Sequence, residues 1–239
     1  MEQFTFGNPL EDIPQIVNAS EPHMALLFLV DTSGSMGAQI QDKETGEVNI
    51  PIIELNDALN RFKAGVCKDD KTKDILDVAI IEFNNQYNIV QEFSPIEYMK
   101  PVELRACGQT YMSEALDVAM NMVDERSRFY RRAGTEPYKP WIVLISDGAP
   151  FDSVDEMAAK INTMVENEKL AFWSLSIPGA DNEVLHKLSG RRVLNLKGYD
   201  FEGFFDWAHK SMRAVSASAP GEKVKGQALP ESVTIDDLM

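Results

Sequence analysis

The chain alternates between short apolar runs and longer stretches in which apolar residues recur every three or four positions. The seven residues from Met24 to Val30 contain no polar side chain, which is typical of a strand buried on both faces of a parallel sheet. The polar residues 84–86 separate two strand-like runs and predict a tight turn, hence one antiparallel edge strand. Five further segments rich in apolar, β-branched or aromatic residues predict strands: 75–83, 87–93, 141–146, 170–177 and 192–196.

Helical spacing of apolar residues marks the segments between the strands. Pro51 suits the first turn of one such helix, and Ser153 with Glu156 has the spacing of a capping box that opens another. Strands that alternate with helices indicate an α/β fold: a doubly wound, mainly parallel central sheet with one antiparallel edge strand and helices on both faces. The helices are predicted over 52–66, 112–123, 154–165, 182–188 and 201–215.

This alternation spans residues 23–216, which we interpret as one domain. Residues 1–22 show no sustained period and are interpreted as an N-terminal lead-in. Residues 37–49 are polar and contain a turn signal, so they predict a loop or a short hairpin. Residues 217–239 turn to Ser, Gly, Pro, Lys and Glu and are interpreted as a flexible acidic C-terminal tail. This tail is either a solvated end or a short partner-binding peptide.

The charge balance is strongly acidic, with 38 Asp and Glu against 23 Lys and Arg and a formal net charge of −15. Because no basic stripe stands out, nucleic acid is not an expected partner. The apolar run that opens the domain is far shorter than the roughly 20 residues of a membrane span. The two cysteines, Cys67 and Cys107, make no disulfide framework. These features predict a cytoplasmic protein that does not bind membranes.

The first strand ends abruptly at Asp31, which is followed by hydroxyls at Ser33 and Ser35. The turn after such a strand lies at the carboxyl edge of the sheet, where open α/β folds bind ligands. A second strand ends at Asp147, and Thr110 presents a hydroxyl just before a helix. Hard oxygen donors of this kind suit Mg²⁺, Mn²⁺ or Ca²⁺. Taken singly, each of these residues is also compatible with an ordinary turn or a helix cap.

The three motifs, in this order, resemble those of the von Willebrand factor type A domain and its metal-ion-dependent adhesion site. The motifs are Asp-x-Ser-x-Ser, a distant Thr before Ala-Leu on a helix, and Ser-Asp-Gly after a strand. The resemblance implies a Rossmann-like fold and a bound divalent cation that accepts an acidic side chain of a protein partner. The implied metal ligands, acting directly or through water, are Asp31, Ser33, Ser35, Thr110 and Asp147.

Two departures from the family pattern concern the surroundings of the predicted ion. The polar residues 37–49 stand where many relatives pass almost directly into a helix, and we expect them to lie beside the ion and to shape the partner surface, although they also fit a tolerated surface loop. Gln109 stands where relatives often carry glycine. This substitution makes the loop before Thr110 less pliable.

An enzyme is the first alternative, because a metal with an open coordination position can activate water for hydrolysis or phosphotransfer. None of His23, His186 and His209 lies within the three motifs, and Cys107 is interpreted as a small packed side chain. We therefore expect no catalytic residues. The second alternative is a scaffold whose ion is only structural.

Within the family, the short single-domain form resembles the bacterial TerY-like proteins associated with tellurium resistance. That resemblance implies a role in stress response or phage defence beside kinases and phosphatases, which are candidate partners.

Overall fold

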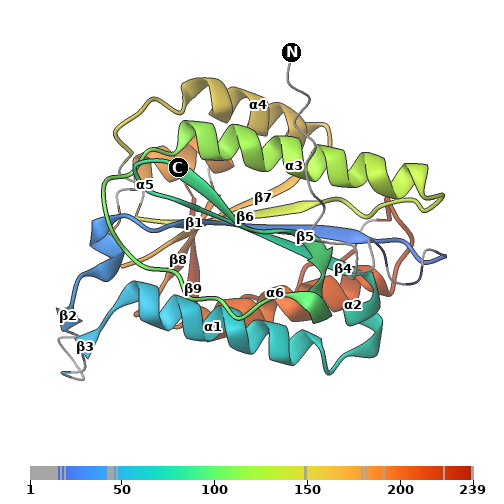
Figure 1. Cartoon of the computed structure of the whole chain (residues 1–239), viewed down its shortest axis with the longest axis horizontal. Coiled ribbons are helices and arrows are strands. Elements are labelled where there is room, and N and C mark those ends of the chain that lie inside the picture. The colour runs from blue at the N-terminus through green and yellow to red at the C-terminus, as the bar shows by residue number, and fades with distance from the viewer. Residues whose placement is uncertain are drawn as a thin grey trace, which may run out of the picture.

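A seven-stranded sheet runs through the middle of this computed structural model, with helices packed against both faces (Figure 1). The strand order is β5-β4-β1-β6-β7-β8-β9. The strands are β1 (Met24–Asp31), β4 (Leu76–Phe83), β5 (Tyr87–Pro95), β6 (Trp141–Ser146), β7 (Ala171–Ser176), β8 (Arg192–Leu196) and β9 (Val233–Asp237). The structure describes residues 16, 18, 20–41, 46, 48–147, 150–178, 180, 182–190, 192–222 and 224–237. Most of the predicted lead-in, residues 1–15, 17 and 19, lies outside the described residues.

The five inner strands β4, β1, β6, β7 and β8 are parallel, and β5 and β9 close the two edges in antiparallel orientation. One face of the sheet carries α3 (Ser113–Arg132), α4 (Asp155–Glu166) and α5 (Asn182–Ser189), and the other carries α1 (Pro51–Val66), α2 (Asp70–Ile75) and α6 (Phe201–Ser216) (Figure 1). The predicted α/β fold with a mainly parallel, doubly wound sheet is confirmed.

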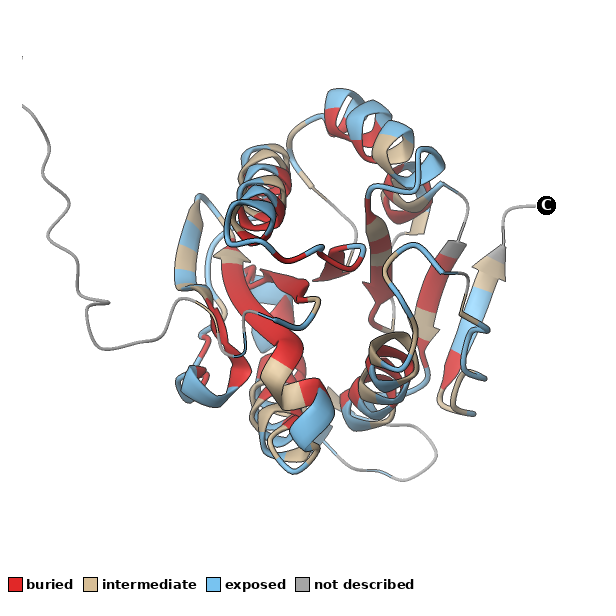
Figure 2. Cartoon of the chain, turned by 90° about the vertical axis from the view of Figure 1, so that its right-hand side faces the viewer, coloured by how far each residue is buried: buried red, intermediate tan, exposed pale blue. Residues whose placement is uncertain are grey.

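Burial of β1 on both faces follows from its uninterrupted apolar sequence. All eight of its residues are buried. Phe28 packs among aromatic rings of α1 and α6, whereas Leu27 and Leu29 pack against the layer of α3 and α4. Figure 2 shows the buried positions gathered in the central strands and on the helix faces turned toward them. This double cover leaves only the ends of the inner strands open to ligands.

A short 3₁₀ helix, η1 (Gly34–Gly37), and a two-stranded hairpin of β2 (Ile40–Gln41) and β3 (Val48–Asn49) connect β1 to α1. The hairpin confirms one of the two structures predicted for residues 37–49. Residues 42–45 and 47 of this segment lie outside the described residues. A second 3₁₀ helix, η2 (Ile96–Tyr98), follows β5.

The interpretation of residues 217–239 as a flexible tail is wrong for β9, which pairs with β8 over five residue pairs from Arg192–Asp237 to Leu196–Val233. Val233 is buried in the core, and its neighbour Ser232 accepts a hydrogen bond from Lys197 N at 2.7 Å. The polar composition of residues 217–232 led to the prediction that the whole C-terminal segment is a tail. The β-branched residues Val233, Thr234 and Ile235 were the signal that predicts it. The sheet therefore has two antiparallel edge strands rather than one.

Two smaller expectations also fail. The capping box is absent, because α4 begins only at Asp155 and its N-cap residue Val154 makes no side-chain hydrogen bond. Val154 is buried, and the helix starts two residues after the predicted cap Ser153, whose hydroxyl accepts the N–H of Asp155 at 3.3 Å. The short helix α2 was not predicted, since its sequence Asp-Lys-Thr-Lys-Asp-Ile is almost entirely polar. Among the described residues, no helix combines the length and apolar character needed to cross a bilayer.

Candidate metal centre

The carboxyl ends of β1 and β6 lie side by side, because the two strands are parallel neighbours with Val30 paired to Ile145. Asp31 ends β1, and Asp147 directly follows β6. Their position at the same edge of the sheet is therefore fixed by the register of the two strands, as predicted from the sequence.

Both carboxylate oxygens of Asp31 accept hydrogen bonds. The backbone N–H of Ser33 donates to Oδ1 at 2.8 Å, and the hydroxyl of Ser146 donates to Oδ2 at 2.7 Å. The Oγ atoms of Ser33 and Ser35 are 2.9 Å apart, and the hydroxyl of Ser35 donates to Oδ2 of Asp147. Four of the five predicted ligand residues thus lie in one hydrogen-bonded cluster.

The cluster is electrostatically incomplete. Asp31 is fully buried, and this burial raises its pKa to about 6, helped by the negative charge of Asp147 and opposed by the hydrogen bonds from Ser33 and Ser146. Within the described part of the chain, none of the groups that shift this pKa is positively charged. The Oδ1 atom of Asp147 is also buried and lacks a hydrogen-bond partner among the described residues. Such a site gains from a cation.

Thr110 lies on a neighbouring loop that is tied to the Asp31–Ser35 loop by backbone hydrogen bonds. Cys107 N donates to Thr32 O at 2.8 Å, and Gly34 N donates to Gly108 O at 3.0 Å. Thr110 itself is buried, and its carbonyl accepts the N–H of Phe151 at 2.8 Å. The Thr110 hydroxyl makes no hydrogen bond in the described part of the chain, so it is not engaged as a helix cap.

Glycine is required at position 108 for two reasons. Its φ of +74° is a left-handed conformation, and a Cβ there would lie 2.8 Å from the side chain of Asn85. The Asn85 Oδ1 in turn accepts the N–H of Gln109 at 2.8 Å. Gln109, the predicted departure from the family pattern, is therefore held by Asn85 through its backbone.

The donor set fits a hard divalent cation. The two carboxylates, Asp31 and Asp147, would balance its charge, and the three hydroxyls of Ser33, Ser35 and Thr110 offer neutral oxygens. Among the described residues, no three His, Cys, Asp or Glu side chains gather in a metal-binding arrangement. The hydroxyls are therefore essential to any metal site built here.

Sequence reasoning missed two residues that shape the site. Ser146 donates to Asp31, and its position before Asp147 in the Ser-Asp pair was a usable signal. Asp152 caps α3: its two carboxylate oxygens accept the N–H groups of Met112 and Ser113 at 2.9 and 2.8 Å. Nothing near Asp152 in the sequence predicts this contact with a helix forty residues away.

The histidines lie away from the cluster. His23 stacks on Tyr130 at the opposite end of β1 from Asp31, whereas His186 and His209 lie within hydrogen-bonding range of carboxylates, at 3.2 Å from Asp236 and 3.3 Å from Asp69. The interpretation of Cys107 as a packed side chain is wrong, because it is exposed. Its loop turns the thiol outward, with Sγ 3.6 Å from the side-chain amide of Asn84.

Comparisons with known proteins agree with this architecture. The fold is similar to that of a point mutant of the PilB minor pilin from Streptococcus sanguinis, with 14% sequence identity and a TM-score of 0.56. The match covers 84% of this chain and 64% of that one. The pilus adhesin SpaC from Lactobacillus rhamnosus GG matches at 12% identity and a TM-score of 0.59, covering 84% of this chain and 31% of that one. The chain thus spans less than two thirds of the length of either protein.

No curated protein matches the chain. The family described as von Willebrand factor type A domain matches residues 26–149, which include all five candidate ligands. The chain belongs to the von Willebrand factor type A domain family, whose members commonly mediate protein–protein interaction.

Proposed function

We propose that the chain is a metal-dependent protein-interaction module. A divalent cation, Mg²⁺ in the first place, is held at the carboxyl edge of the sheet and binds an Asp or Glu side chain of a protein partner. Mn²⁺ and Ca²⁺ accept the same hard oxygens. The residues that hold the cation, directly or through water, are Asp31, Ser33, Ser35, Thr110 and Asp147.

The observation that carries this proposal is the buried carboxylate of Asp31 beside the half-buried carboxylate of Asp147, with no positively charged group of the described residues among those that shift the pKa of Asp31. Asp31 has no exposed surface, and the negative charge of Asp147 raises its pKa further. A buried carboxylate beside another carboxylate is unfavourable unless a cation or a proton joins it. Mg²⁺ supplies the opposite charge and an exchangeable position for an incoming oxygen.

The hairpin of β2 and β3 selects the partner in this proposal. In the chain the hairpin follows η1, which itself contains the candidate ligand Ser35. The hairpin residue Val48 is 58% exposed. Gly37 at the base of the hairpin lies against Ala106, where a Cβ would come within 3.0 Å of the Ala106 side chain. This close approach ties the hairpin to the loop that carries Thr110.

We further propose the cellular setting that the TerY-like resemblance implies. The protein acts in the cytoplasm in a bacterial stress-response or phage-defence system, with a kinase or phosphatase of that system as partner, and without nucleic acid or membrane contacts. The likeness to two bacterial pilus proteins concerns the fold alone and does not bear on this setting.

Binding of the cation and capture of the partner are tested separately. Isothermal titration with MgCl₂ is expected to give one site in the wild type and none in Asp31→Ala, with exposed Asp57→Asn as the matched control. Partner capture from lysate is expected to be lost with EDTA and with Asp31→Ala. Capture that survives both changes refutes the mechanism and favours the scaffold, and turnover of a phosphoester substrate with Mg²⁺ favours the enzyme.

A further inference from the structure

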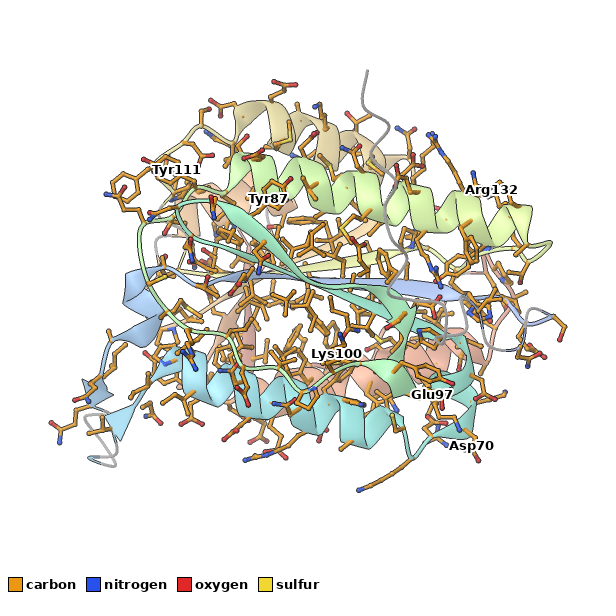
Figure 3. All side chains as sticks on the ribbon, in the orientation of Figure 1. Asp70, Tyr87, Glu97, Lys100, Tyr111 and Arg132 are labelled. Atoms are coloured by element: carbon orange, nitrogen blue, oxygen red, sulfur yellow. The ribbon has the colours of Figure 1, made fainter. Side chains whose placement is uncertain are left out.

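Two aromatic side chains stand exposed beside the candidate metal centre. Tyr111 directly follows Thr110, and Phe151 lies across from it, with ring centroids 6.0 Å apart and planes inclined by 27°. The side chains are 41% and 66% exposed. Figure 3 shows Tyr111 pointing outward at the edge of the molecule where Figure 1 places η1 and the hairpin. We call Tyr111 and Phe151 the aromatic pair.

Hydrogen bonds fix the backbone that carries both rings. Tyr111 N donates to Asn84 O at 2.8 Å, and Phe151 N donates to Thr110 O at 2.8 Å. Asp152, next to Phe151, is anchored by the two N–H groups at the start of α3. The backbone under the aromatic pair is therefore fixed, so covering the rings requires little ordering of the chain, which is the usual property of an anchor point in an interface.

The surroundings favour an apolar occupant over a basic one. Three acidic residues lie within four positions of Phe151, and each already has a role: Asp152 accepts two backbone N–H groups, Asp155 pairs with Lys187 at 2.6 Å, and Asp147 belongs to the candidate metal centre. An Arg or Lys of a partner placed over the rings would thus find no free carboxylate among these three. An apolar side chain would remove the exposed ring surface from water without such a requirement.

We propose that the aromatic pair is the second half of the partner-binding surface and binds a large apolar side chain of the partner. This inference rests on the proposed function, because the other half is the cation that takes the partner's carboxylate. Thr110 and Tyr111 are consecutive residues, and an extended segment advances about 3.4 Å per residue. The partner segment therefore carries an Asp or Glu with a Phe, Tyr, Trp, Leu, Ile or Met within about three residues of it.

The test selects peptides from a displayed library of random 12-residue sequences in MgCl₂ and elutes them with EDTA. With the wild type, the eluted peptides are expected to share an acidic residue and a large apolar residue within three positions. With the Tyr111→Ser/Phe151→Ser double variant, the acidic residue is expected to persist without the apolar one. Tyr98→Ser, which changes a 38% exposed tyrosine on η2, is the matched control and should select like the wild type.

One selected peptide then provides a measurement that does not depend on the folding of a variant. Replacing its large apolar residue by Ala is expected to weaken binding to the wild type about 10- to 30-fold, a loss typical of an interface anchor. The same replacement should leave binding to the double variant unchanged. Equal losses with both proteins overturn the inference.

The outcomes separate this inference from the proposed function. Peptides that elute with EDTA but show no apolar preference, or that carry Arg or Lys beside the acidic residue, overturn the role of the aromatic pair and leave the metal-dependent binding standing. A wild type that retains no peptide in an EDTA-sensitive way, and that shows no heat of Mg²⁺ binding, overturns both.

Discussion

Asp31→Asn should make the metal-free protein more stable while removing its response to Mg²⁺. Asn keeps the shape of the side chain and can accept the Ser33 N–H through Oδ1, and its amide can donate to the Ser146 hydroxyl in place of the present bond. The change removes a buried negative charge that faces Asp147. A residue placed for a ligand is thus expected to weaken the fold that carries it.

The magnitude follows from the pKa of Asp31. A carboxyl group that binds its proton more tightly in the folded state contributes a stability that is present at low pH and is lost as the pH rises through the unfolded value and then the folded value. For Asp31 these pKa values are 3.8 and about 6, so at pH 7 the loss is complete. At about 1.36 kcal/mol per unit it amounts to about 3 kcal/mol. In a domain of this size that corresponds to about 6 to 12 °C in Tm.

Urea unfolding in EDTA measures this difference. At pH 7 Asp31→Asn is expected to exceed the wild type in free energy of unfolding by up to about 3 kcal/mol, and the gap should close as the pH falls toward 4. Asp57→Asn, a change at an exposed carboxylate, should shift stability by no more than about 0.5 kcal/mol. An Asp31→Asn protein that is less stable than the wild type at pH 7 in EDTA would falsify the electrostatic reasoning.

Three further predictions concern other parts of the molecule. Mg²⁺ should raise the Tm of the wild type more at pH 7 than at pH 5, because protonated Asp31 competes with the cation below about 6; equal shifts in calorimetry at the two values contradict this. Asp152→Ala should lower the free energy of unfolding by about 1 kcal/mol through loss of the cap on α3, and urea titration that finds no change argues against the cap. Asp77→Ala should cost about 3 to 5 kcal/mol, because it breaks the buried ion pair in which the Asp77 carboxylate accepts from Arg126 at 2.7 Å inside the core; a thermal melt within a few degrees of the wild type would count against this value.

Long periodic elements were predictable from the sequence, and the candidate site followed from them. The apolar run of β1 and the apolar helical spacing of α1 and α6 predict which residues of these elements are buried, since each element buries a continuous face. Parallel pairing of β1 with β6 then brings Asp31 and Asp147 to one edge without further information. The metal itself remains a prediction.

The failures share a physical cause, because each depends on contacts between segments distant in the sequence. β9 is too short to show a period, and it forms because β8 offers an open edge and the core accepts Val233. Asp152 caps a helix from another loop, and the buried Val154 takes the N-cap position of α4 in place of Ser153. The exposure of Cys107 likewise depends on two features of its loop: the hydrogen bond from Cys107 N to Thr32 O and the left-handed conformation of Gly108.

The C-terminal strand has a consequence for how the protein is produced and shortened. Without β9, the backbone N–H and C=O groups on the outer side of β8 would be unpaired, and an open strand of this kind invites pairing with other molecules. A chain that ends at Ser216, the last residue of α6 and of the predicted domain, keeps every candidate ligand. We nevertheless expect it to aggregate. Versions of the protein made for crystallography or binding assays therefore need to extend through Asp237.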